Sequence, residues 1–386
     1  MKKNKRFVLV SLLLALVLSL NINVSAATTK TVPKTLTVKE AVDYALKYNG
    51  DILKLKFSEE EMGYAVSGVR SGRKALNDMI EQLEGTGLSV RETLGDALNY
   101  DSYLLRNKIT EQRLERQKKL LNKTYVARTE MVKLSVESAY YNVLIKKIEY
   151  DDAKRNLDVV KKQTEVGEIK LKYGTISEMD YKSLQISENA SELTFVQAEY
   201  AYNTAKIDFN DMLGLPFDTD IELTSPLEIS KVDIKLTEEK KKELRENDLT
   251  FQSATETYNT AMEDLKYKKA YYGYSSDEYK TAQLDAQSAE ITYQNDKNKL
   301  EKSILSTYNN LDVLNKTVKI YADKKDLMNL ALGVQNIRLK YGTATEDDVI
   351  TASINYNTAV NDYYEMLLNY NMLATLYDKN IMVPAQ

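Results

Sequence analysis

Side chains that carry out chemistry in most enzymes are scarce in this sequence. The chain contains no His and no Cys, so it lacks the commonest general base, the commonest thiol nucleophile and the usual zinc ligands. Pairs of carboxylates can hydrolyse glycosidic bonds, but the acids here stand at salt-bridge spacing from lysines, as Glu238 and Glu239 do from Lys241 and Lys242. A solvated helix face explains this spacing better. We expect no enzyme activity, no metal site and no cofactor.

The first residues have the pattern of a secretory signal peptide. A basic start is followed by an apolar run over 7–20, which is shorter than the roughly 20 residues of a spanning helix, and then by Val24, Ser25 and Ala26. We therefore predict a signal peptide over 1–26 and a mature chain in the cell envelope, meaning periplasm, cell wall or an association with an outer membrane.

The charge of the mature chain argues against a nucleic-acid partner. Residues 1–26 carry four of the 53 Lys and Arg and none of the 57 Asp and Glu, so the mature balance is 49 minus 57, or -8. An acidic chain does not attract phosphates. Without Cys there are no disulfides, so stability must come from packed helices.

Proline marks the limits of long helical segments, because its ring cannot sit inside a helix. The four prolines leave two long spans free, 34–215 and 227–383. Polar side chains followed by an acid predict helix starts at Thr37 with Glu40, Ser89 with Glu92, Ser177 with Asp180, Ser275 with Glu278, and Thr345 with Asp348. The helices predicted in this way are 38–84, 89–99, 101–172, 178–213, 237–271, 277–340 and 346–379. One short strand is possible at Ile221–Leu223.

Apolar residues recur every seven positions along the segment 101–172. The series is Leu120, Ala127, Leu134, Tyr141 and Ile148, with Met131 and Ile145 on the same face. This is the pattern of a coiled-coil seam. It leaves two arrangements open with equal weight: a bundle completed by other subunits, and an antiparallel four-helix bundle complete as a monomer.

The pentapeptide LKYGT occurs twice, at 171–175 and 339–343, with a constant offset of 168. The copies also match at Glu178 with Glu346 and at Asn189 with Asn357. Such a period indicates a duplicated structural unit. We predict an all-α fold made of two tandem repeats of long antiparallel coiled-coil hairpins, at 27–216 and 237–386, joined by a linker at 217–236.

Each LKYGT copy ends one helix and precedes another. Gly174 and Gly342 are followed by Thr and then by an acidic first turn, as expected for a left-handed residue closing a helix before a new N-cap. A simple hairpin turn explains one copy. Two copies at matched positions favour a role for the tips.

At these residues the chain resembles the TolC-like outer-membrane efflux factors. The resemblance rests on the opening LTVKEAVDYALKYNGDI from Leu36, the two YGT turns, the Asp six residues after each Gly, and the sequence LGLP at 213–216. A weaker repeat of the opening places Leu244 and Asn247 198 positions after Leu46 and Asn49. The resemblance covers nearly all of the mature chain.

The resemblance implies a homotrimer whose helices form a hollow tunnel. It also implies that the hairpin tips dock on a membrane-fusion adaptor attached to an inner-membrane transporter. The implied docking residues are Tyr173, Gly174, Thr175, Tyr341, Gly342 and Thr343. Asp180 and Asp348 are the implied acidic ring at the aperture, where carboxylates favour cations; helix capping is the alternative role for either Asp.

The sequence departs from the family at the opposite end. The family inserts two membrane-spanning strands per repeat, and each strand needs roughly 9 to 11 alternating residues. The connections here, 85–101 and 271–276, have no room for such pairs, so we expect no β-barrel. They are aromatic instead, with Tyr100, Tyr103, Tyr271, Tyr272 and Tyr274. These tyrosines either contact cell-wall glycan, an envelope partner or a membrane surface, or pack against one another.

The sequence therefore favours a passive, non-enzymatic export component of the TolC-like type. The alternative is a structural or adhesive coiled-coil protein of the envelope that keeps the hairpins and transports nothing.

Overall fold

The fold is described from a computed structural model that covers residues 34–87, 89–95 and 98–382. The signal peptide predicted over 1–26 lies outside the described residues. The described residues form two compact units, and each unit is built from segments that are distant in sequence. Unit 1 contains Gly50–Arg128 and Leu249–Asn298, and unit 2 contains Val32–Asn49, Thr129–Asp248 and Lys299–Gln386.

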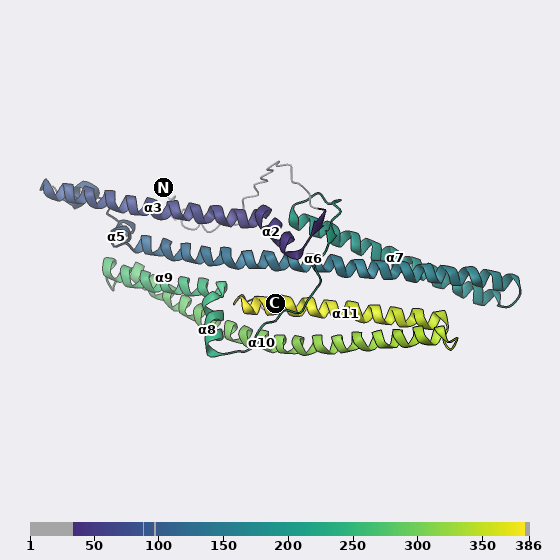
Figure 1. Cartoon of the computed structure of the whole chain (residues 1–386). Coiled ribbons are helices and arrows are strands. Elements are labelled where there is room, and N and C mark those ends of the chain that lie inside the picture. The colour runs from purple at the N-terminus through teal and green to yellow at the C-terminus, as the bar shows by residue number, and fades with distance from the viewer. Residues whose placement is uncertain (1–33, 88, 96–97, 383–386) are drawn as a thin grey trace. The chain divides into compact units, whose positions relative to one another are not determined.

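Helices make up most of both units (Figure 1). Unit 1 holds α3 (Gly50–Gly85), α4 (Val90–Leu94), α5 (Tyr100–Arg106), α9 (Leu249–Tyr272) and the first parts of α6 (Ile109–Lys172) and α10 (Asp277–Lys340). Unit 2 holds the remainder of α6 and α10 together with α2 (Val38–Tyr48), α7 (Glu178–Leu213), α8 (Glu238–Asn247) and α11 (Glu346–Asp378). The strands β1 (Thr35–Leu36) and β2 (Glu222–Leu223) also belong to unit 2.

The predicted all-α fold of long helical hairpins is confirmed. Helices α6 and α10 each have 64 residues, which corresponds to about 96 Å at 1.5 Å per residue. Each is followed by a short turn and a return helix. In the described residues of the connections 85–100 and 272–277, there is no strand.

Three predicted helices are broken, and the prediction of continuous helices there was wrong. Segment 38–84 divides at Asn49 and segment 237–271 divides at Asp248, where the backbone is extended with ψ of 116° and 114° respectively. Both residues still donate their N-H to a carbonyl four residues back, in Ala45 and Leu244. The two helix breaks, Asn49 and Asp248, are therefore 199 positions apart. The weak repeat seen in the sequence indicated 198.

Segment 101–172 divides at Lys108, which adopts a left-handed backbone with φ of 63°. A residue with a Cβ is strained in this conformation, so a Lys is not expected there. The period of the apolar residues does not signal the break either. Two further predictions at helix ends also need correction. The short helix predicted at 89–99 is limited to α4, and the cap of α10 is Ser276, whose Oγ accepts the Tyr279 N-H at 3.1 Å, and not Ser275.

Other helix starts agree with the sequence. Thr37, Ser177 and Thr345 each form a capping box, in which the cap hydroxyl accepts an N-H and the acid three residues later reaches back. Ser89 accepts the N-H of Glu92 at 3.4 Å. These caps satisfy amides that would otherwise lack partners at the helix start.

The main hydrophobic core lies in unit 2. It joins α2, the middle of α6 and the end of α7 through buried side chains that include Ala41, Tyr140, Phe209 and Leu213. Tyr140 is fully buried, and its hydroxyl donates to the Leu36 carbonyl at 2.8 Å. The predicted strand is β2, which pairs in parallel with β1.

The segment 217–236 is fastened to unit 2 by polar side chains. The Asn371 amide donates to the Glu228 carbonyl at 2.7 Å and accepts the Ser230 N-H at 2.8 Å. Tyr377 donates its hydroxyl to the Lys235 carbonyl at 2.8 Å. The segment is thus an ordered strap across the helices.

Candidate functional site

The first YGT turn closes α6 with a set of backbone hydrogen bonds around Gly174. The Gly174 N-H reaches the Leu171 carbonyl at 2.9 Å, and the Thr175 N-H reaches the Lys170 carbonyl at 2.9 Å. Gly174 has φ of 69°, so this is a Schellman motif with glycine in the left-handed position. The Thr175 hydroxyl also donates to the Lys170 carbonyl at 2.9 Å.

The second turn repeats this geometry. The N-H groups of Gly342 and Thr343 bond to Leu339 and Arg338 at 2.9 and 2.8 Å, and Gly342 also has φ of 69°. The Arg338 guanidinium adds a bond to the Thr343 carbonyl at 3.3 Å. Two turns 168 residues apart therefore present the same backbone and the same Tyr, Gly and Thr side chains.

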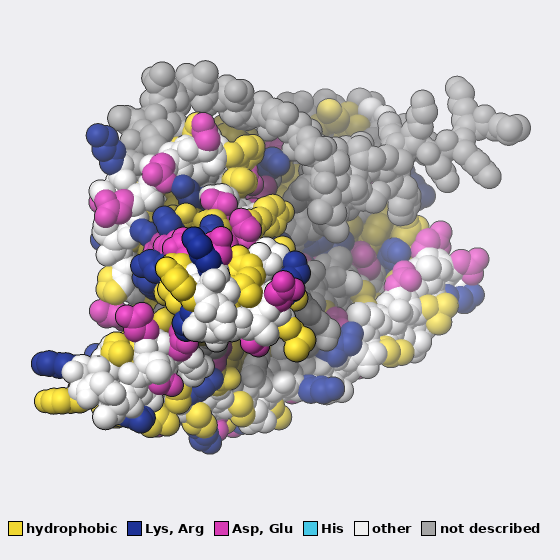
Figure 2. Space-filling model, turned by 90° about the vertical axis from the view of Figure 1, so that its right-hand side faces the viewer, with side chains coloured by type: hydrophobic (Ala, Val, Ile, Leu, Met, Phe, Trp, Pro, Cys, Tyr) yellow, Lys and Arg dark blue, Asp and Glu magenta, His cyan; other side chains and the backbone are white. Residues whose placement is uncertain are grey.

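Solvent reaches most of the surface at both tips. Tyr173 is 77% exposed and Tyr341 is 75% exposed, and a Cβ added to either glycine would meet no atom. Both turns lie at one end of unit 2, at the right of Figure 1. Figure 2 looks onto that end and shows hydrophobic side chains mixed with charged ones. These tips are accessible to a partner.

The two predicted aperture acids serve as helix caps. The Asp180 carboxylate accepts the Ser177 hydroxyl at 2.7 Å and the Ser177 N-H at 3.1 Å. Both bonds lower the pKa of Asp180, and the bond from the Ser177 hydroxyl is the larger cause. At Asp348, the Thr345 N-H is the larger cause of a lowered pKa and the Thr345 hydroxyl the second. The geometry supports the capping role that the sequence left open.

The long helices of unit 2 have a definite order. Lys324 on α10 pairs with Asp362 on α11 at 2.8 Å, and Asp347 on α11 accepts a hydrogen bond from Gln163 on α6. The Asn156 amide of α6 donates to the Ser191 hydroxyl of α7 at 3.0 Å. The order is α10, α11, α6, α7, so α10 and α7 are the outer helices.

Both outer helices carry exposed apolar side chains at heptad spacing. On α7 these are Met179, Ile186, Leu193, Tyr200 and Ile207, and on α10 they are Val313, Ile320, Leu327 and Val334, followed by Tyr341 directly after the end of the helix. We call these rows the α7 edge and the α10 edge. A row of this spacing is the seam of a coiled coil, and here no helix of the same chain covers it among the described residues.

Pairs of residues related by the repeat show that the exposure of an apolar side chain depends on whether its helix is an outer or an inner one. Val313 on the outer helix α10 is 58% exposed, whereas Ile145, its counterpart 168 residues earlier on the inner helix α6, is 4% exposed. The sequence predicted a seam on α6 that includes Ile145 but did not identify the edges. Seven-residue spacing was visible in α7 and α10, although spacing alone does not tell which seam is covered.

In unit 1 the predicted aromatic residues come together. The ring centroid of Tyr100 lies 5.6 Å from those of both Tyr271 and Tyr272. The ring centroid of Tyr103 lies 5.3 Å from that of Tyr271. Tyr274 stands apart, against Tyr279 at 5.5 Å and beneath the Lys269 ammonium at 4.4 Å. Four of the five predicted tyrosines therefore pack against one another, which is one of the two interpretations given from the sequence.

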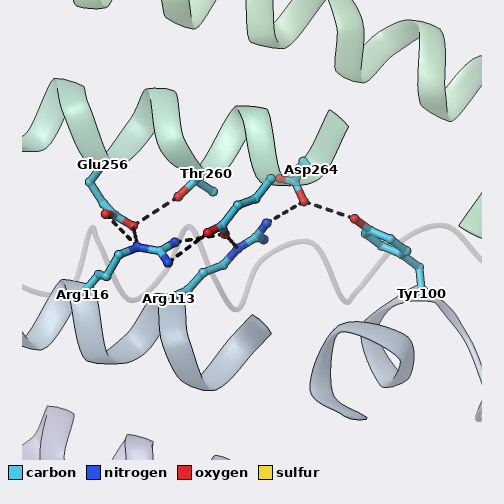
Figure 3. Close-up of polar contacts among 7 residues, drawn as sticks. Tyr100, Arg113, Arg116, Glu256, Thr260 and Asp264 are labelled. Carbon is cyan, nitrogen blue, oxygen red and sulfur yellow. Dashed lines mark hydrogen bonds and ion pairs between the residues drawn. The ribbon is translucent and has the colours of Figure 1, made fainter. Parts of the chain in front are cut away.

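A ladder of ion pairs joins α6 to α9 beside these tyrosines (Figure 3). Arg113 contacts Glu263 at 3.1 Å and Asp264 at 3.0 Å, and Arg116 contacts Glu256 at 2.7 Å. The Tyr100 hydroxyl donates to Asp264 at 3.3 Å. Burial, followed by the charge of Asp264, raises the pKa of Tyr100. Sequence reasoning did not identify this ladder.

Neither a metal-binding cluster nor a membrane-spanning helix is found among the described residues. No group of three or more Asp and Glu side chains in this part of the chain is placed to hold a metal ion. Among the helices that the structure describes, none is long and apolar enough to cross a membrane.

Comparison of the sequence with known proteins finds no matching family model and no matching curated protein. Comparison of the structure does find proteins of similar fold. The Campylobacter jejuni CmeC outer membrane channel has a TM-score of 0.66 at 10% identity, covering 90% of this chain and 87% of that one. The open state of the Neisseria gonorrhoeae MtrE outer membrane channel has a TM-score of 0.60 at 12% identity, covering 92% and 93%.

A structure of CusC that concerns folding and transmembrane channel formation gives a TM-score of 0.61 at 10% identity, with coverage of 93% of this chain and 96% of that one. The similarity thus extends over nearly the whole length of each channel. The chain has the fold of the TolC-like outer-membrane channels.

Proposed function

We propose that this chain is a non-enzymatic, TolC-like export component of the cell envelope, in which three copies form a helical tunnel. The observation that carries the proposal is the pair of exposed apolar edges on the outer helices α7 and α10. A closed monomeric bundle would bury such rows, because each large apolar side chain contributes about 1.5 to 3 kcal/mol when it is buried.

The two edges differ from each other, and this determines how copies can associate. If the α7 edge of one copy packs against the α10 edge of the next, every copy buries both edges through one kind of contact. A contact of this head-to-tail kind generates a ring when the rotation closes. The similarity to known channels supports a ring of three, with four long helices contributed by each copy.

The mass in solution of the purified chain 27–386 tests this proposal. We expect three times the mass of one chain by light scattering. Changing Val313→Glu and Leu327→Glu on the α10 edge places charges in the seam and should yield monomers. The matched control is Phe217→Glu, since Phe217 is 61% exposed on the strap and belongs to neither edge. A monomeric wild type, or a trimer that survives the edge substitutions, would refute the tunnel.

Docking of a membrane-fusion adaptor is the second part of the proposal. The candidate surface comprises Tyr173, Gly174, Thr175, Tyr341, Gly342 and Thr343, and what supports it is the repeated, rigid and exposed turn. A photoreactive residue at position 173 or 341 should crosslink to an adaptor with a helical hairpin in intact cells. The same probe at Tyr64, which is 76% exposed in unit 1, supplies the background. Equal yields at all three positions would contradict docking at the tips.

The aperture role of Asp180 and Asp348 depends on the ring. Three copies would bring six capping carboxylates to one end of the tunnel, where their combined field would favour cations. Single-channel conductance of the trimer tests this part. Replacing both acids by Asn should reduce cation selectivity, and unchanged selectivity would leave capping as their function.

A further inference from the structure

A groove within unit 2 runs along α6, between α7 and α11. Its volume is about 620 Å³, which is within the range of about 300 to 1,000 Å³ that is usual for small-molecule sites. The residues that line it come from these three helices of one copy of the chain. None of them belongs to the α7 edge, the α10 edge or the YGT turns, so the groove is separate from the surfaces on which the proposed function rests.

One contact fixes which residues of α6 and α11 lie side by side along the groove. The two helices are antiparallel, because α6 leads to one YGT turn, α11 begins after the other, and both turns lie at one end of unit 2 (Figure 1). Gln163 of α6 donates to Asp347 of α11. Asn361 lies 14 positions after Asp347, and Glu149 lies 14 positions before Gln163. Asn361 is therefore beside the turn of α6 that holds Glu149 and Asp152.

The two ends of the groove differ in polarity. Val159, Val349 and Ile350 line the end nearer the YGT turns, whereas Asp152 and Asn361 line the end farther from them. Ile350 and Asn361 lie 11 positions apart on α11, which is about 16 Å at 1.5 Å per residue. A molecule that fills the groove must therefore be apolar at one end and polar at the other.

Two oxygens at the polar end are buried and accept no hydrogen bond from any residue that the structure describes. They are Oδ2 of Asp152 and Oδ1 of Asn361. Arg155 bonds to the other oxygen of Asp152, and burial raises the pKa of Asp152 in spite of that ion pair. The neighbouring Glu149 is paired with Lys146 at 2.8 Å. A buried acceptor without a donor is unfavourable, so a ligand that donates hydrogen bonds would stabilise this end of the groove.

The chemistry of the two oxygens distinguishes between possible ligands. A carboxylate or a phosphate would place further oxygens against them and would be repelled. A hydroxyl has one hydrogen to donate and can serve only one of the two. A primary ammonium group has three donors and no acceptor, so it can bond to both oxygens at once. Its bond to a carboxylate is charge-assisted and roughly twice as strong as a bond between neutral groups.

We propose that this groove binds an amphipathic primary amine. The ammonium group donates to Asp152 Oδ2 and to Asn361 Oδ1. The apolar part of the amine lies along Val159, Val349 and Ile350. Because one copy of the chain supplies the whole site, binding does not depend on the ring of three.

Isothermal titration of the chain 27–386 with decylammonium, kept below its critical micelle concentration, tests this proposal. We expect one ligand per chain. Decyltrimethylammonium has the same alkyl chain and the same charge but no N-H, so it should bind at least about tenfold more weakly, which is the factor expected for one lost bond to a charged group. Decanoate, which has a similar alkyl chain and the opposite charge, should not bind.

Two substitutions locate the bound amine. Asp152→Asn removes the charge and Asn361→Leu removes the second acceptor, so each should weaken the binding of decylammonium at least about tenfold. The matched control is Asp158→Asn, because Asp158 is an exposed acid of the same helix and does not line the groove. Circular dichroism of each variant checks that it is folded, and the comparison of ligands on the unaltered chain does not depend on any variant.

Three results would overturn the proposal. They are no binding of decylammonium, equal binding of decyltrimethylammonium, and a loss of affinity in Asp158→Asn as large as that in Asp152→Asn. The edge variant, Val313→Glu with Leu327→Glu, should bind decylammonium as tightly as the unaltered chain does. Failure of the ring of three therefore leaves the titration unchanged, and the two proposals are tested separately.

Discussion

At the scale of single residues, glycine has a different effect in the turns than in the helices. Gly174 needs a left-handed backbone, although its Cβ would meet no atom, whereas Gly333 in α10 is helical and also open. We predict that Gly174→Ala destabilises the protein by about 1 to 2 kcal/mol through backbone strain. Gly333→Ala should stabilise it by about 0.5 to 1 kcal/mol. Urea unfolding followed by circular dichroism measures both, and equal signs would contradict the strain argument.

Capping at the two tips predicts a pH dependence of stability. The pKa values of Asp180 and Asp348 are lower in the folded chain than their usual value of 3.8. Their contribution to stability is therefore present above that value and is lost as pH falls through the lower folded pKa. An ionised carboxylate accepts the cap hydrogen bonds more strongly than a protonated one does.

The order of causes at the two acids makes this testable by substitution. Removing the hydroxyl with Ser177→Ala should raise the pKa of Asp180 toward its usual value, because that hydroxyl is the largest cause of the shift and only the Ser177 N-H remains to lower it. Thr345→Ala should move the pKa of Asp348 less, because there the hydroxyl is only the second cause of the shift, after the Thr345 N-H. Titration of 13C-labelled aspartate carboxyls measures both values. A larger response at Asp348 would show that the assigned contacts are wrong.

At the scale of elements, α9 depends on charge more than on apolar burial. None of the side chains described in α9 is fully buried, and Glu263 takes bonds from both Arg113 and Arg116. Bonds to charged groups contribute about 1.5 to 3 kcal/mol each. We predict that Glu263→Gln, or 1 M salt, increases amide exchange throughout α9 by about tenfold, which corresponds to about 1.4 kcal/mol.

An exposed ion pair supplies the comparison for α9. Lys316 and Asp312 of α10 lie 2.7 Å apart with side chains 69% and 47% exposed, so Lys316→Gln should change local exchange by less than about 0.5 kcal/mol. If α9 responds no more than α10 does, burial and not charge holds α9 in place.

Most elements were predictable because their signals are local. Caps such as Ser177 and glycines such as Gly174 fix helix ends through contacts within five residues, so α7 was predicted without error. The breaks at Asn49, Asp248 and Lys108 were missed because no Pro marks them and because the apolar period continues through the neighbouring helices. Exposure of the edges was also missed, since Ile145 and Val313 are alike in sequence and differ only in what lies beside them.

At the scale of the whole molecule, the two units differ in how they are stabilised. The main apolar core belongs to unit 2, while unit 1 contains the ion-pair ladder and the packed tyrosines Tyr100, Tyr103, Tyr271 and Tyr272. We predict that unit 2 folds without unit 1 when flexible linkers replace 50–128 and 249–298. Circular dichroism should show a cooperative thermal transition for this shortened chain. A chain that stays unfolded would mean that α6 and α10 need unit 1 to form.

The difference between the α7 edge and the α10 edge has a genetic consequence. A closed ring of three contains three contacts, and each uses one edge of either kind. A copy with charges on its α10 edge still offers an intact α7 edge, so it joins wild-type copies and leaves one contact unmade. Alleles that alter one edge should therefore be dominant over the wild type, whereas alleles that alter both edges should be recessive because their products are left out of the ring.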